Sequence, residues 1–289
     1  MNTHEHINLR QLCLGYFLYS ISLKIMALPS LLATGAGNLA WLVALLGSVL
    51  EVVLVFIATR LIKHLDQRGK FFRTLCFVFI PIIAAQVWLT CRQVYRMAYT
   101  DLSTDLSLFI FILTLILLGS FFITRQPRSF FRTAEIIWLL FALALVIAVV
   151  PPLYKLQPDW GSLVQGDYTR LLPTLGGNLL FFESAIFVFI FGAETKKTDR
   201  ELRRINLTAI LCSIGYVVFT VLLVILFGPL LPLKPNAIVD ITTSSQFITD
   251  SGALDWLIVI ATLAALVLRF GLQLVAVATL CKRGCGRHA

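Results

Sequence analysis

Long apolar runs separated by short polar stretches dominate this chain. Eight runs of helical length lie near residues 12–36, 39–61, 74–98, 106–123, 133–152, 174–194, 207–231 and 255–281. An α-helix needs about 20 apolar residues to cross the hydrocarbon core of a bilayer. The runs are continuous in Leu, Ile, Val and Phe and lack the alternation of barrel strands. The pattern therefore predicts an all-α polytopic membrane protein with eight transmembrane helices.

Composition supports this class and excludes others. The chain has 289 residues, of which 58% are hydrophobic and 13% are charged. A soluble domain is about 45–50% apolar and about 25% charged. The net charge of +9 does not indicate a nucleic-acid partner, because the basic residues are not gathered on one soluble face. Residues 1–289 are expected to form a single transmembrane domain whose first helix is retained rather than removed as a signal peptide.

The positive charges predict the orientation of the helices. Seventeen Lys and Arg fall in the N-terminal segment, the loops after the second, fourth and sixth runs, and the C-terminal tail, whereas three fall in the opposite loops. Cytoplasmic loops carry the excess of Lys and Arg in membrane proteins. Both termini are therefore predicted to be cytoplasmic (N-in/C-in).

Four ionisable residues lie deep within the predicted spans: Lys24, Glu51, Glu183 and Arg269. Such a group costs at least about 2.5–3.5 kcal/mol at the bilayer centre, so it is expected to face the protein interior and to have a partner. The four residues could be intramembrane charge pairs that hold the bundle together. Alternatively, Lys24 and Glu183 could bind the carboxylate and the ammonium of an amino acid, or take part in proton coupling.

Two of the predicted helices contain residues that interrupt helices. Pro29 lies within the first run, so a kink or break is expected near residues 24–29. Gly35 and Gly37 are expected to end that helix before a tight turn. Gly, Gly and Asn at 176–178 favour a discontinuous sixth helix. Freed backbone groups at such breaks line cavities at the midplane of membrane proteins.

No catalytic signature accompanies these features. The four histidines lie in the termini or in a predicted cytoplasmic loop, and no nucleophile comes with a base and an orienting group. The six cysteines form neither a disulfide framework nor a zinc pattern. The sequence predicts that the chain is not an enzyme and has no metal site and no cofactor.

Residues 19–65 resemble the first two helices of the spore-germination permeases, the B subunits of nutrient germinant receptors (GerAB-like). The resemblance depends on the Leu28-Pro29 dipeptide, the small residues at 33–37 and Trp41, which opens the second helix. It resumes at residues 181–218 and 253–280, which are similar to the sixth and eighth helices of that family.

The resemblance implies membership of the amino acid–polyamine–organocation superfamily, whose fold is a 5+5 inverted repeat of the leucine-transporter type. Helices one and six are broken in that fold and hold the ligand at mid-membrane. The ligand-binding residues that it implies here are Ser22, Lys24, Pro29, Phe182, Glu183, Ser184 and Phe187. Ser22 and Lys24 stand where many members have glycines, so Lys24 is expected either to fill a cation site or to anchor the helix.

The chain also departs from the family in length. Residues 1–152 match the first five-helix repeat, and residues 153–289 match an incomplete second repeat of three helices. The expectation is a truncated reading frame, a decaying gene copy, or a shortened variant that a partner completes.

The function implied by the resemblance is that of a germinant-receptor membrane subunit. It would bind a small germinant, an amino acid, at mid-membrane and contribute to triggering spore germination. Its partners would be a membrane subunit with a soluble domain, a lipoprotein and the bilayer of the bacterial cell membrane or spore inner membrane, with no nucleic acid. The alternatives are an amino-acid permease coupled to protons or sodium, and a non-transporting membrane scaffold subunit.

Overall fold

A computed structural model of the protein describes residues 8–64, 70–102, 114, 117–122, 127–155, 162–164, 166–192, 198–234, 236, 238–241 and 253–284. These residues are helical almost throughout and include no strand. The helices are α1 (Leu9–Ala36), α2 (Ala40–His64), α3 (Lys70–Met97), α5 (Pro127–Lys155), α6 (Leu171–Gly177), α7 (Ser184–Phe191), α8 (Asp199–Phe227) and α10 (Ala253–Gly284). The shorter turns are η1 (Gly37–Leu39), η2 (Ala98–Leu102), η3 (Ser162–Val164), η4 (Tyr168–Arg170), η5 (Leu179–Phe182) and η7 (Gly228–Leu233). The all-α prediction is confirmed for the described residues.

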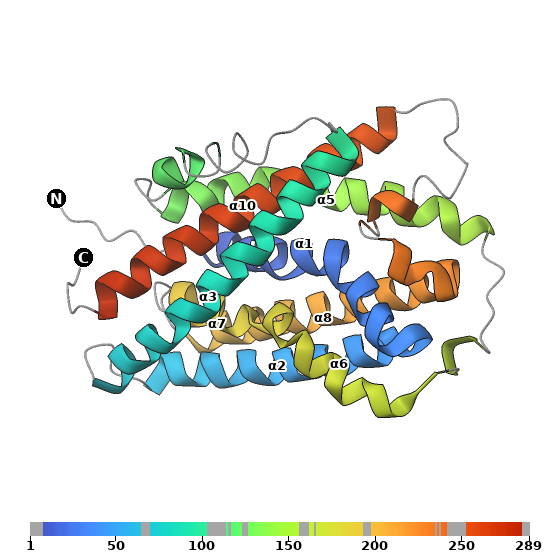
Figure 1. The fold of residues 1–289 in the computed structure, drawn as a ribbon. Coiled ribbons are helices and arrows are strands. Elements are labelled where there is room, and N and C mark those ends of the chain that lie inside the picture. The colour runs from blue at the N-terminus through green and yellow to red at the C-terminus, as the bar shows by residue number, and fades with distance from the viewer. Residues whose placement is uncertain are drawn as a thin grey trace.

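The long helices form one bundle, and α1 lies inside it (Figure 1). α1 contacts α2, α5, α8 and α10. Every residue from Leu18 to Ser30 is buried. A helix that is enclosed on all sides must be apolar nearly all round, as the first apolar run of the sequence is. α1 is therefore the central column against which the other helices pack.

Five helical segments of the described chain are long and apolar enough to cross a membrane. They are Leu9–His64, Phe71–Thr100, Ser129–Val150, Asp199–Leu233 and Trp256–Gly284, and the first of them comprises α1, η1 and α2. The bent pair of α6 and α7 makes a sixth if it counts as one span. Most of the predicted span 106–123 lies outside the described residues. A polytopic membrane protein is thus supported, whereas neither the count of eight spans nor the inverted repeat is confirmed.

Large apolar side chains cover the outer surface of the bundle. Among them, Val49 is 55% exposed, Trp88 69%, Ile136 75% and Leu211 60%. Soluble monomers rarely expose apolar patches larger than a few hundred Å². Lipid tails are as apolar as leucine, so the hydrocarbon core of a bilayer solvates such a surface well.

α1 passes Pro29 as one continuous α-helix, so of the kink or break expected near residues 24–29 the break is absent. Proline removes only one N–H from the backbone ladder, and the enclosing helices hold the rest of the segment helical. Next to the proline, Ser30 Oγ donates to the Ala27 carbonyl at 3.2 Å. The end of the helix agrees with the prediction, because Gly37 adopts φ 58° and its N–H bonds to the carbonyl of Ala33.

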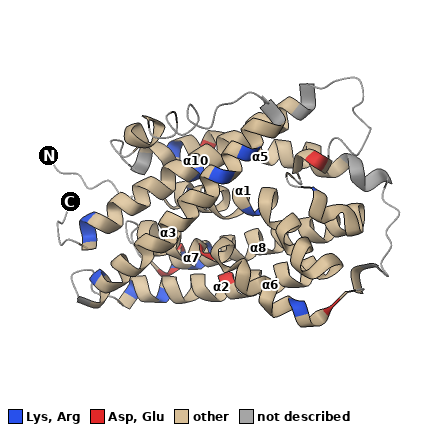
Figure 2. Cartoon of the chain, viewed as in Figure 1, with Lys and Arg blue, Asp and Glu red and all other residues tan. Residues whose placement is uncertain are grey.

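Basic residues gather at one end of the bundle. The end of α2, the start of α8 and the end of α10 lie there (Figures 1 and 2). Two of these helices are joined by an exposed ion pair, in which Lys63 Nζ lies 2.7 Å from Asp199 Oδ1. This is the end that the charge pattern of the sequence predicts to be cytoplasmic.

A close approach between α2 and η5 requires glycine at position 47. A Cβ atom added to Gly47 would lie 2.2 Å from Cζ of Phe182, a ring that is itself buried. We expect Gly47→Ala to lower the free energy of unfolding by about 1–3 kcal/mol, because overpacking forces the ring or the backbone to move. Thermal unfolding of the purified protein in mild detergent measures this loss.

Gly215→Ala is the matched control for Gly47→Ala. Gly215 lies within α8, and a Cβ atom there would meet nothing within 4 Å. Alanine is favoured over glycine inside a helix by about 0.5–1 kcal/mol, so this variant should be as stable as the parent or slightly more stable. Equal losses in the two variants would contradict the close packing of α2 on Phe182.

Candidate functional site

The sixth predicted helix is broken at Asn178, as its Gly-Gly-Asn segment indicated. The segments Tyr168–Gly177 and Leu179–Phe191 meet at an angle of 68°. Asn178 ends α6, because its Nδ2 donates to the Thr174 carbonyl at 2.9 Å and its backbone N–H donates to the Leu175 carbonyl at 3.0 Å. The break leaves α7 as a half-helix that begins in the interior of the protein.

Lys24 of α1 and Glu51 of α2 form an ion pair in this interior. Their side chains are 3% and 1% exposed. Lys24 Nζ also donates to Ser20 Oγ at 3.0 Å, and Ser20 Oγ donates to Glu51 Oε1 at 3.1 Å. The ammonium lies 5.3 Å from the ring centroid of Phe182 and 5.8 Å from that of Tyr216. A carboxylate, a hydroxyl and two aromatic rings thus replace the water that a lysine normally has around it.

Glu183 and Arg269 of α10 form a second buried ion pair, with Arg269 Nη2 3.0 Å from Glu183 Oε1. Arg269 Nη2 also donates to Gln86 Oε1 of α3 at 2.8 Å, and Nη1 donates to the backbone carbonyl of Tyr19. The Tyr19 hydroxyl donates to Glu183 Oε2 at 3.2 Å, and its ring centroid lies 4.5 Å from the guanidinium carbon. Both carboxylate oxygens of Glu183 therefore accept hydrogen bonds.

Ser184 connects the two ion pairs. Its hydroxyl donates to Glu51 Oε1 and shares a hydrogen bond of 2.8 Å with the hydroxyl of Tyr16. Glu183 precedes Ser184 and is the N-cap residue of α7, where the helix dipole favours a negative charge. Both pairs are therefore anchored on adjacent residues at the start of α7. Figure 2 shows acidic and basic positions together in the middle of the bundle, next to α7.

Three buried donors beside the second pair have no hydrogen-bond partner among the described residues: Arg269 Nε, Gln86 Nε2 and, one turn after Arg269 on α10, Gln273 Nε2. The side chains of Arg269 and Gln86 are in direct contact. Native proteins satisfy the great majority of their buried polar atoms, and a buried donor left alone costs about 1–3 kcal/mol. Because the side chains of Arg269 and Gln86 are bonded to each other through other atoms, their two lone donors belong to one small cluster. A carboxylate, which accepts several hydrogen bonds at once, is the chemical group that such a cluster suits.

No family model matches this chain, and no curated protein matches it either. The family to which residues 19–65 show resemblance therefore stays a prediction. The arguments about function below depend on the geometry of the broken helix.

The structure gathers most of the ligand-binding residues that the resemblance implied. Those that meet at the break are Lys24, Phe182, Glu183, Ser184 and Phe187. The ring centroid of Phe187 lies 4.7 Å from that of Tyr19. Ser22 and Pro29 are buried in α1 but take no part in these contacts, and Ser22 Oγ makes no hydrogen bond within the described chain.

Sequence reasoning missed four polar members of the network: Tyr16, Tyr19, Ser20 and Gln86. A signal was present for two of them, because Tyr16, Ser20 and Lys24 recur every four residues. Residues four apart lie on one face of a helix, so the lysine could have been assigned two hydroxyl neighbours. Gln86 has only the weaker signal of an amide within an otherwise apolar run.

Proposed function

We propose that this chain binds a small zwitterionic molecule, such as an amino acid, at the broken helix. We further propose that it does so as the membrane subunit of a nutrient germinant receptor, the class that residues 19–65 resemble. The observation that carries the binding proposal is the pair of unpartnered donors, Arg269 Nε and Gln86 Nε2, beside the carboxylate of Glu183. A donor cluster next to an acid provides what each end of a zwitterion needs.

In this proposal the ligand carboxylate accepts hydrogen bonds from Arg269 and Gln86, and the ligand ammonium pairs with Glu183. The sequence-based expectation had Lys24 in place of Arg269. Lys24 is held by Glu51 and Ser20, so its donors are already engaged. Exchange of the Glu183–Arg269 contact for two ligand contacts leaves neither charge unpaired, which avoids the cost of several kcal/mol for an isolated buried ion.

The proposed site also has a route by which binding could be sensed. Ser184 follows Glu183 directly and bonds to Glu51 on α2. A ligand that draws Glu183 away from Arg269 would shift the start of α7 and change the contacts of the Lys24–Glu51 pair. Partner subunits that pack on the outer surface of α2 would then encounter a different surface. The proposed partners are the soluble-domain subunit and the lipoprotein of the receptor.

Gln86→Met is the sharpest test of the ligand site, because it removes the lone donor Gln86 Nε2 and keeps the four ion-pair residues and the side-chain volume, although Arg269 Nη2 also loses Gln86 Oε1 as an acceptor. The full chain is purified in mild detergent and titrated calorimetrically with each proteinogenic amino acid. We expect at least one amino acid to bind to the parent protein. We expect Gln86→Met to weaken that binding about tenfold or more, since a hydrogen bond to a charged group contributes about 1.5–3 kcal/mol.

Gln93→Met is the matched control. Gln93 is a second buried glutamine on α3, and its Nε2 donates to Asn236 Oδ1 at 2.9 Å, away from the ion pairs. Its substitution should leave the affinity unchanged. Absence of binding by any amino acid, or equal losses in the two variants, would refute the site. Gradient-driven uptake of the bound amino acid into vesicles would favour the permease alternative over the receptor subunit.

A further inference from the structure

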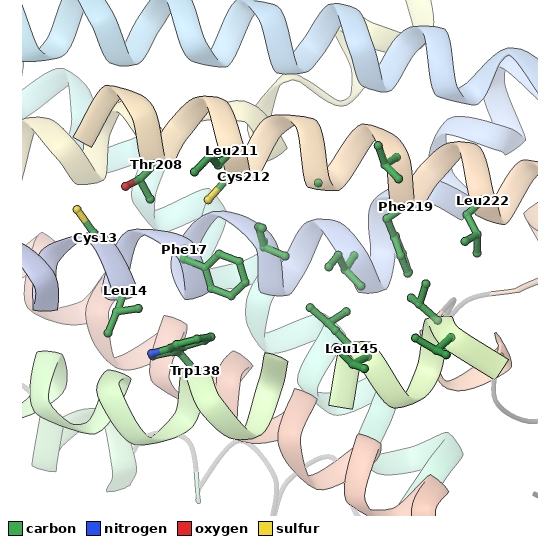
Figure 3. A pocket seen from close by; sticks show the side chains of 17 residues that line it. Cys13, Leu14, Phe17, Trp138, Leu145, Thr208, Leu211, Cys212, Phe219 and Leu222 are labelled. Atoms are coloured by element: carbon green, nitrogen blue, oxygen red, sulfur yellow. The ribbon is translucent and has the colours of Figure 1, made fainter. Parts of the chain in front are cut away.

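An apolar groove runs along the side of the bundle between α5 and α8, with α1 as its floor (Figure 3). Its volume is about 610 Å³. Phe17, Trp138, Cys212 and Phe219 are among the side chains that line it. The Trp138 and Phe17 rings meet edge to face, with centroids 6.4 Å apart. None of the four ion-pair residues lines the groove, and its lining is almost wholly apolar.

The groove opens toward the bilayer. Its rim includes exposed residues of two helices: Val146 of α5, and Leu211 and Val218 of α8. Gly215 lies between the two α8 rim residues, and no atom lies within 4 Å of the place where its Cβ would be. The missing side chain keeps the groove accessible from the lipid side.

The length of the groove matches one leaflet. Its lining on α1 extends from Cys13 to Ile25, which covers about 18 Å at 1.5 Å per residue. One leaflet contributes about half of the roughly 30 Å hydrocarbon core of a bilayer. A single acyl chain that runs along the groove would therefore span from the basic end of the bundle to near the bilayer centre.

The basic end of the groove has charge that suits an anionic headgroup. Arg204 lies one turn before Thr208 on the lined face of α8, and it is close enough to Cys13 to interact with it electrostatically. Arg10 lies one turn before Leu14 on the lined face of α1. The nearby acid, Glu135, lies 4.0 Å from Arg10 and accepts a hydrogen bond from Gln11. A second acid, Glu201, lies one turn before Arg204 on α8. Arg204 forms no ion pair within the described residues, so its guanidinium is available to an anionic headgroup.

We propose that this groove is a binding site for an anionic phospholipid of the leaflet at the basic end of the bundle. One acyl chain occupies the groove, and the phosphate is held by Arg204, with Arg10 beside it. Basic pockets between transmembrane helices on the cytoplasmic side are suited to anionic headgroups, and the apolar lining is suited to the chain. The site does not depend on the proposed function of the helix break.

Trp138 allows the site to be measured directly. The full chain is reconstituted in phosphatidylcholine vesicles that contain, at equal mole fraction, either phosphatidylglycerol or phosphatidylcholine brominated in the acyl chains. Bromine quenches indole fluorescence at contact, and the Trp138 signal is obtained as the difference between the parent protein and Trp138→Phe. We expect the quenching to show a preference of about fivefold for phosphatidylglycerol, the effect of about 1 kcal/mol for one basic residue at the surface.

Arg204→Gln should abolish this preference, whereas Arg203→Gln should keep it. Arg203 is the neighbouring exposed arginine on α8, and it lies on a different face of the helix from the groove. Equal quenching by the two brominated lipids in the parent protein would overturn the proposal. A preference that survives Arg204→Gln would overturn it as well.

Gly215→Leu tests the acyl chain separately from the headgroup. The new side chain enters open space, so the fold should tolerate it, and circular dichroism checks that it does. It fills part of the groove and should reduce quenching of Trp138 by brominated phosphatidylglycerol. Unchanged quenching in Gly215→Leu, or no quenching of Trp138 in the parent protein, would show that no acyl chain occupies the groove. A second copy or a partner helix that covers the groove would give the latter result.

Discussion

Glu51→Leu is expected to lower the free energy of unfolding by about 3–5 kcal/mol, because it leaves the ammonium of Lys24 buried without its counter-ion. The lysine would keep Ser20 and the faces of two aromatic rings as neighbours. These groups do not compensate for the lost charge, because an exposed cation–π contact contributes about 0.5–1 kcal/mol and a desolvated one about 2 kcal/mol. Thermal and denaturant unfolding in one mild detergent measures the loss.

The double variant Lys24→Met with Glu51→Leu should recover most of that loss. Replacing a buried ion pair by apolar residues of similar volume is often neutral or stabilising. The hydroxyls left behind keep partners, since Ser184 retains Tyr16 and Ser20 can donate to a carbonyl of its own helix. A double variant as unstable as Glu51→Leu alone would show that the charge pair is not the origin of the effect.

The exposed pair of Lys63 and Asp199 provides the comparison for Glu51→Leu. Its side chains are 45% and 69% exposed. Surface pairs contribute about 0–1 kcal/mol, so Asp199→Asn should change stability by no more than that. Glu51 and Asp199 are each paired with a lysine. The difference between the expected losses of stability therefore comes from the difference in burial alone.

Arg269→Met is expected to lower the free energy of unfolding at least as much as Glu51→Leu does, again by about 3–5 kcal/mol. Arg269 is almost fully buried, and its removal leaves the carboxylate of Glu183 without a counter-ion. It also leaves Gln86 Oε1 without the donor that it has in the parent protein. The same unfolding measurements apply.

A second substitution at Glu183 should restore only part of the stability lost in Arg269→Met. Lys24→Met, by contrast, should restore most of the stability lost in Glu51→Leu. Adding Glu183→Met removes the lone carboxylate but takes the acceptor from the Tyr19 hydroxyl, and the amide oxygen of Gln86 stays without a donor. Each such buried group costs about 1–3 kcal/mol. Full recovery in this double variant would contradict the role of Arg269 as the donor to Gln86.

The sequence was enough to find the charged residues at the centre of the site but not to pair them. Depth within a span is a property of one helix, so the apolar runs around Lys24, Glu51, Glu183 and Arg269 placed all four near mid-membrane. Which acid meets which base depends on the rotation and packing of different helices. The structure pairs Lys24 with Glu51 and Glu183 with Arg269, which is one arrangement of the charge pairs that the sequence allowed.

The two helix interruptions predicted from the sequence show a similar limit of sequence-based prediction. At 176–178, two glycines and an asparagine that bonds to carbonyls of the preceding turn give the chain an alternative to the helical ladder, and the helix breaks. At Pro29 only one N–H is lost, and the surroundings of α1 decide the outcome in favour of a continuous helix. Those surroundings come from segments far away in the sequence. The groove was not foreseen for the same reason, since α1, α5 and α8 form it jointly.

The two ion pairs also differ in when they can form during biosynthesis. Glu51 lies 27 residues after Lys24, so at about 5–20 residues per second both are made within about 1–5 s of each other, as parts of one helical hairpin. Arg269 lies 86 residues after Glu183, so the ribosome needs about 4–17 s to supply it. During that interval the half-helix that begins at Ser184 carries an unpaired acid beside the nascent bundle. Membrane insertion of α10 is therefore the step that supplies the counter-ion of Glu183, and a chain that stalls before α10 keeps this acid without its partner.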